Sequence, residues 1–205
     1  MTSHVAALKA EKPDLIFSSM LFADLPVFMK QGAAAGLFDG VKVVLPAAGW
    51  QLNQLKKEFM PEGVIFGHNT LYFDYAQGSA LQKAFVADYM DRYKEAPHWE
   101  ADRAYFALAA YKAGVEAAQK AGGKWPTPDA VAQSIPGIEI ESLGGKGRFR
   151  KDKIAEQVFY QGPSTNNNKY DFPTLAEVDV FQAEQLQKPA GVDFWEWIKT
   201  GKMPV

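Results

Sequence analysis

Two short apolar segments on either side of one amphipathic helix constrain the fold of this chain most. Residues 14–19 form an apolar run that ends in two serines, and residues 41–45 form a second apolar run. Between them, Asp24 is predicted as the N-cap of a helix that ends near Ala35, where Gly36 suits the C′ position. This pattern predicts a βαβ unit, in which the two strands are parallel and the crossover is right-handed.

The next part of the chain predicts one more strand and then mostly helix. Residues 62–67 form a third candidate strand, which follows a short helix around residues 51–58. A capping box at Ser79 starts a long helix that Pro97 ends, and a second long helix covers residues 99–121. These elements predict an α/β fold whose middle part is helical.

The last third of the chain changes character. Thr127 starts a short helix, and the glycine-rich, basic residues 144–150 follow it. Because they lack the spacing of a phosphate-binding loop, these residues predict a flexible hairpin turn. Residues 154–160 and 178–181 are candidate strands, and residues 194–198 carry more aromatic side chains than a free tail usually has.

The two long helices lack a sheet to cover. Residues 68–137 contain no strong strand pattern, and the three clear strands already have helices of their own. A helix in an α/β protein needs an apolar surface to pack on. We therefore predict exposed apolar surface over residues 79–121, with self-association or poor solubility as its consequence. The second long helix is predicted to pack through Ala101, Ala104, Tyr105, Leu108, Val115 and Ala118.

Composition excludes several classes of function. The chain has 205 residues, a net charge of -2 and no cysteine, so disulfides and thiolate chemistry are ruled out. The chain has no run of lysine and arginine of the kind that binds nucleic acid. No apolar stretch reaches the ~20 residues that span a bilayer. The N-terminus lacks the pattern of a signal peptide, which taken alone predicts a cytoplasmic location.

Candidate catalytic residues are few. Ser18 and Ser19 end a predicted strand, but neither lies in a Gly-x-Ser-x-Gly turn. Glu100 and Asp102 lie two positions apart at a helix start, where carboxylates usually interact with the helix dipole and face apart. The histidines are too far apart in the chain for metal-ligand spacing: His4, His68 and His98. The sequence predicts neither an enzyme nor a bound metal or cofactor.

Two loops suggest a ligand-binding edge. In an open parallel sheet, ligands bind beyond the carboxyl ends of the strands. Each aromatic residue in these loops, taken alone, is more typical of packing. Their shared position still favours an edge that faces a ligand, built from Ser18, Ser19, Met20, Leu21 and Phe22 in one loop and Ala47, Ala48 and Trp50 in the other.

The order of several segments resembles one family. They are residues 12–17 (KPDLIF), 28–31 (FMKQ), 35–37 (AGL), 61–64 (PEGV), 85–93 (FVADYMDRY), 104–114 and 147–149 (GRF). This series resembles the branched-chain amino acid (Leu/Ile/Val-type) substrate-binding proteins of ABC transporters. The resemblance implies the periplasmic-binding-protein type I fold, with two Rossmann-like lobes, present here only as a C-terminal portion.

The resemblance also implies how the chain is divided. Residues 1–66 correspond to a core portion of the second lobe, residues 67–150 to a crossover and the helical layer of the first lobe, and residues 151–205 to the return to the second lobe and the tail. A small-molecule ligand, an ABC permease and a periplasmic location are implied as well. The sheet that the long helices lack would belong to an absent N-terminal lobe.

For the binding residues, the resemblance implies the two loops above and a third contact at Trp99 and Glu100. Amino-acid binders of the family carry an acidic residue and a tyrosine where this chain has Ala47 and Leu21. These departures favour an apolar or aromatic carboxylate over an α-amino acid. The alternatives are a cytoplasmic ligand-sensing module of the same fold, and a small α/β hydrolase that uses Ser18 or Ser19.

Overall fold

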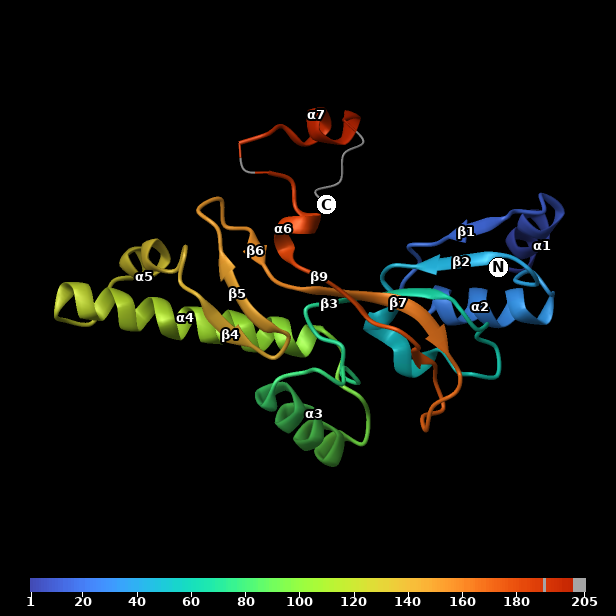
Figure 1. Ribbon diagram of the computed structural model, residues 1–205, viewed down its shortest axis with the longest axis horizontal. Helices are drawn as coiled ribbons and strands as arrows, with labels where there is room; N and C mark the ends of the chain where they lie inside the picture. Colours follow the sequence, from blue (N-terminus) through green and yellow to red (C-terminus); the bar gives the residue numbers. More distant parts are fainter. Residues whose placement is uncertain (190, 201–205) are drawn as a thin grey trace.

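The computed structural model describes residues 1–189 and 191–200 (Figure 1). Its main sheet runs in the order β1-β2-β3-β7-β8, and β9 also pairs with β7. The first three strands are parallel, as the βαβ pattern predicts, and β7 pairs antiparallel with β3. The strands are β1 Leu15–Phe17, β2 Lys42–Leu45, β3 Ile65–Asn69, β7 Phe159–Thr165, β8 Thr174–Leu175 and β9 Asp179–Phe181.

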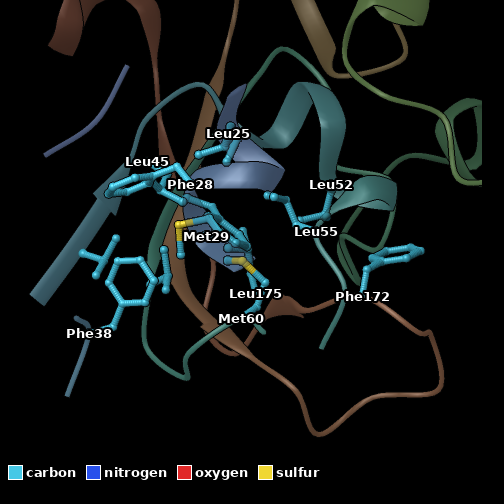
Figure 2. Packing of buried hydrophobic residues seen from close by; sticks show 14 of the residues in the cluster. Leu25, Phe28, Met29, Phe38, Leu45, Leu52, Leu55, Met60, Phe172 and Leu175 are labelled. Carbon is cyan, nitrogen blue, oxygen red and sulfur yellow. The ribbon is translucent and has the colours of Figure 1, made fainter. Parts of the chain in front are cut away.

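Helix α2 (Asp24–Ala34) packs its apolar side against this sheet and forms the main core. Leu25, Phe28 and Met29 are buried on α2. Figure 2 shows them gathered with Leu45 of β2 and with Leu52 of the 3₁₀ helix η1 (Ala48–Gln54). Helix α1 (Thr2–Ala10) lies beside α2 and buries only Val5. This part of the chain holds the two loops that the sequence singled out.

Three local predictions near this core need correction. Asp24 is the first residue of α2 rather than its N-cap, because the turn before it makes Ala23 the cap. The short helix predicted around residues 51–58 is η1, which begins at Ala48 directly after β2. The third strand begins at Ile65, since Gly63, with φ +74°, forms a turn before it.

The helical part of the chain lies to one side of the main sheet (Figure 1). Ser79 and Thr127 cap α3 and α5 as predicted. The basic segment 144–150 is not only a turn, because β4 and β5 form an antiparallel hairpin and β6 pairs with β5. The predicted strand 154–160 is divided between β6 and β7. These elements are α3 Ala80–Tyr93, α4 Glu100–Gly122, α5 Pro128–Ser134, β4 Ile140–Ser142, β5 Gly145–Phe149 and β6 Ala155–Glu156.

The predicted packing side of α4 is wrong for Ala104, Tyr105 and Leu108, which are exposed, whereas Ala101 and Val115 are half-buried and Ala118 is buried. The small sheet β4-β5-β6 and α5 cover a different side, on which Phe106, Ala110 and Gly114 are buried. Leu108, predicted to pack, is 71% exposed. Between β3 and β4 the structure has no strand, so no further sheet covers this side. The exposed apolar surface predicted over residues 79–121 is therefore confirmed on α4.

Strand β1 also differs from its prediction as a buried strand. It lies at the edge of the sheet, and only Ile16 is buried. Leu15 and Phe17 point to the other face and are 51% and 64% exposed. An edge strand with free backbone groups and apolar side chains is a site where another chain can pair.

The end of the described chain contains β9, as predicted, and two short helices. Helix α6 (Ala183–Leu186) follows β9, and α7 (Phe194–Lys199) carries the aromatic tail. No residue of α7 is buried. Among the described residues, no helix is long and apolar enough to cross a membrane.

We expect the chain to self-associate in a concentration-dependent way. Exposed apolar side chains on α4 and β1 lose contact with water when two copies meet. Light scattering should therefore show a rising mean mass with concentration, and Leu108→Glu should reduce it. Gln119→Glu, which adds the same charge near the other end of α4, is the control. A monomer at all concentrations, without binding of an apolar dye, would contradict this expectation.

Candidate functional site

The loop after β1 has a fixed and unusual backbone. The Ser18 hydroxyl accepts a hydrogen bond from the backbone N–H of Met20 at 3.2 Å. Phe22 has a left-handed backbone with φ +56°, although its side chain is 63% exposed. The Gln51 amide holds this residue, since its Nε2 donates to the Phe22 carbonyl at 2.8 Å. A bulky residue kept in this region of φ often marks a functional position.

The loop after β2 meets the first loop. The rings of Phe22 and Trp50 lie edge to face, with centroids 4.6 Å apart. Trp50 also lies 6.2 Å from the ring of His98, again nearly perpendicular. Thus the ends of two parallel strands and the segment before α4 contribute to one aromatic edge, which consists of Phe22, Trp50 and His98.

At the start of α4, one aromatic residue and a cation follow His98 of this edge. The Arg103 guanidinium lies 4.3 Å from the centroid of the Trp99 ring, at the distance of a cation–π contact. The backbone N–H of Glu100 donates to His98 Nδ1 at 3.3 Å. Thr70, just after β3, donates to the Trp99 carbonyl at 3.4 Å. These bonds tie the third predicted contact to the end of β3.

The sequence-predicted residues do not all lie at this edge. Phe22 and Trp50 are in contact, and Trp99 and Glu100 directly follow His98. Ala48 is 1% exposed in the core, so packing accounts for it, and Met20 packs partly against the same core. The others are placed nearby without a ring contact or side-chain hydrogen bond of their own: Ser19, Leu21 and Ala47.

Sequence reasoning missed three residues of this region: Gln51, His98 and Arg103. His98 was considered only as a metal ligand, although it lies next to the predicted Trp99. Gln51 gave no signal, since its partner Phe22 lies 29 residues away in the chain. Arg103 forms no ion pair within the described part of the chain, and it lines a hollow of about 430 Å³ with Phe106, Phe149 and Phe159.

Two side chains, one at the edge and one next to it, have buried polar atoms without partners among the described residues. His68 on β3 is 2% exposed, and burial lowers its pKa from 6.5 to about 3. A neutral imidazole is therefore expected at physiological pH. Within the part of the chain that the structure describes, its Nε2 has no hydrogen-bond partner, and neither does the buried Trp50 Nε1. No group of three histidine or acidic side chains among the described residues is placed to hold a metal ion.

A family model described as a periplasmic binding protein matches residues 1–168. The chain belongs to the periplasmic binding protein family. The type I fold expected from the sequence is thereby confirmed, in a partial form. This fold family is a non-enzymatic, solute-binding family of ABC transporters, so Ser18 and Ser19 need no catalytic role. No curated protein sequence matches the chain.

Solved structures agree with this membership. A solute-binding protein of an ABC transporter from Rhodopseudomonas palustris BisB5, in complex with 3,4-dihydroxybenzoic acid, is 25% identical with a TM-score of 0.68. The match covers 89% of this periplasmic binding protein chain and 48% of the Rhodopseudomonas protein. The leucine-, isoleucine-, valine-, threonine- and alanine-binding protein from Brucella ovis is 20% identical with a TM-score of 0.71, and the shares are 92% and 48%. The chain thus spans about half the length of the structures it matches.

Proposed function

We propose that this chain is the C-terminal part of the solute-binding component of an ABC-type uptake system. In this proposal it forms one wall of a cleft for amino acids or small apolar or aromatic carboxylates, and it holds them without chemistry. The observation that carries the proposal is the aromatic edge at the carboxyl ends of β1 and β2, where open parallel sheets bind ligands. An ABC permease would be the protein partner, and the periplasm the location.

The grouping of the elements around a main sheet and a separate helical part supports this proposal. Residues 1–66 contain α1, α2, β1, β2 and the start of β3, and residues 151–205 add β7 and β9 to the same sheet. Residues 67–150 hold α3, α4, α5 and the β4-β5 hairpin, with a small core of their own around Phe106. Lobe closure would then involve the two chain segments that connect these parts, near residues 70 and 157.

The residues at the aromatic edge favour an aromatic carboxylate as the ligand. Phe22 and Trp50 offer ring faces and edges, and next to them Arg103, which lies over the Trp99 ring, forms no ion pair among the described residues. Ala47 provides no negative charge for the ammonium group of an amino acid. The benzoate-type ligand of the Rhodopseudomonas protein is of the same chemical class.

Saturation-transfer NMR on the chain tests this function, because it detects millimolar binding. We expect transfer to benzoate and 4-hydroxybenzoate, weaker transfer to leucine, and none to a sugar such as glucose. Trp50→Ala should abolish the transfer, and Trp125→Ala, which removes a tryptophan 73% exposed after α4, should not. If no acid of the panel shows transfer, or if Trp50→Ala leaves it intact, the proposed site is wrong.

A further inference from the structure

A small cavity adjoins the aromatic edge. Trp50 and Asn53 of η1, His68 of β3 and the segment 96–98 before α4 line it. Its volume is about 10 Å³, which is the space that one water molecule or one hydroxyl group needs. Trp50 lines this cavity and also contacts Phe22, so the cavity lies next to the aromatic edge.

Two of the lining residues bring buried polar atoms without partners. Trp50 Nε1 and His68 Nε2 are both buried, and neither forms a hydrogen bond within the described residues. Buried polar groups in native proteins are nearly always satisfied, by protein, ordered water or ligand. Two orphaned atoms on residues that line the same cavity therefore point to a missing polar group inside it.

The chemistry of the two atoms identifies that group. The Trp50 indole N–H only donates, so an ammonium group, which also only donates, does not fit. A carboxylate is larger than the cavity and would carry its charge in a buried place without a cation beside it among the lining residues. A hydroxyl group accepts from the indole N–H, and it pairs with His68 Nε2 in either imidazole tautomer because it both donates and accepts.

We propose that this cavity is a subsite for one hydroxyl oxygen: a water molecule occupies it until a ligand that carries a hydroxyl group replaces that water. The inference rests on the proposed function, because the ligand's ring would lie at the aromatic edge. It goes further in naming hydroxyl-bearing aromatic compounds as the class that the site prefers. Gly49 suits the subsite, since a side chain there would collide with His68 and with the Gly67 carbonyl.

The test uses the indole N–H signals of the chain in ¹⁵N NMR, with phenol as the probe and toluene as its match without a hydroxyl. Trp50→Phe assigns the Trp50 signal among the five tryptophans, and the exposed Trp125 serves as the reference. We expect phenol to shift the Trp50 N–H signal saturably and toluene to leave it in place. His68→Phe should weaken the phenol effect several-fold while the other indole signals confirm an intact fold.

The proposal is overturned if phenol leaves the Trp50 signal in place, or if toluene shifts it equally. Benzoate separates this inference from the proposed function. A phenol effect without any binding of benzoate or 4-hydroxybenzoate would support the subsite and contradict the carboxylate-binding function. Equal affinity for benzoate and 4-hydroxybenzoate, without a phenol effect, would support the carboxylate-binding function and contradict the hydroxyl subsite.

Discussion

Acidification from pH 6.5 to pH 4 is expected to lower the free energy of unfolding by about 3 kcal/mol through His68 alone. Burial lowers the pKa of this imidazole from 6.5 to about 3 in the folded chain. The unfolded chain binds the proton below pH 6.5 and the folded chain does not, so each pH unit in this window costs about 1.4 kcal/mol. The contribution is fully present above pH 6.5 and is lost as the pH falls.

Urea unfolding between pH 7 and pH 4 measures this effect as a difference between variants. His68→Phe removes the titrating group and keeps a ring of similar size, so its stability should fall less steeply with acid than that of the unmodified chain. His4→Phe is the matched control, because His4 is exposed on α1. If His68→Phe and the unmodified chain lose stability in parallel, His68 is not a buried neutral imidazole.

Asp102→Ala is expected to destabilise the chain by about 3 kcal/mol. The carboxylate of Asp102 is 0% exposed and accepts hydrogen bonds from the Leu143 N–H at 2.7 Å and from Gln157 Nε2 at 3.0 Å. The Gly144 N–H, at 3.3 Å, and the Ser142 hydroxyl, at 3.4 Å, also donate to it. Removal of the carboxylate leaves several buried donors without an acceptor, and each costs about 1 kcal/mol or more.

These bonds join the two parts of the molecule. Asp102 lies on α4, Gly144 in the turn between β4 and β5, and Gln157 directly before β7 of the main sheet. Gly144 also accepts a hydrogen bond from the Tyr160 hydroxyl at 3.0 Å and has no room for a side chain against Thr70. We infer that Asp102 stabilises the region where the helical part meets the main sheet.

Urea unfolding at pH 7 measures the loss, with Asp88→Ala on the exposed side of α3 as the control. Asp88 lies 3.8 Å from Arg92 and both side chains are exposed, so its removal should change stability by less than about 0.5 kcal/mol. Equal effects of the two substitutions would contradict the role of Asp102.

Burial also raises the pKa of Asp102 despite its hydrogen bonds. The contribution of this shift to the free energy of unfolding therefore falls as the pH rises through the carboxyl range, which is opposite to the effect of His68.

Local signals in the sequence were reliable where a few neighbouring residues determine the structure. Ser79 and Thr127 accept hydrogen bonds from backbone N–H groups three residues later, so their caps are visible in the sequence. The parallel pairing of β1 and β2 follows from the short connection through α2. The fold class and the neighbouring positions of the loops after β1 and β2 could be predicted for the same reason.

Predictions failed where the partner lies far away in the chain. Asp102 was interpreted as a carboxylate that interacts with the helix dipole, because its donors lie 40 to 55 residues later. The exposed side of α4 was predicted to be its packing side, because periodicity shows an apolar side and not what covers it. His68 was considered only as a metal ligand, since its burial depends on η1 and Tyr72.

The affinity of this chain for carboxylates tests the central claim most directly. The claim is that the chain provides one wall of a two-sided cleft, so a bound ligand keeps much of its surface in water. Isothermal titration with benzoate, 4-hydroxybenzoate and leucine should give dissociation constants weaker than about 1 mM, which corresponds to a binding free energy of no more than about -4 kcal/mol. Micromolar binding by the isolated 205-residue monomer would contradict the claim.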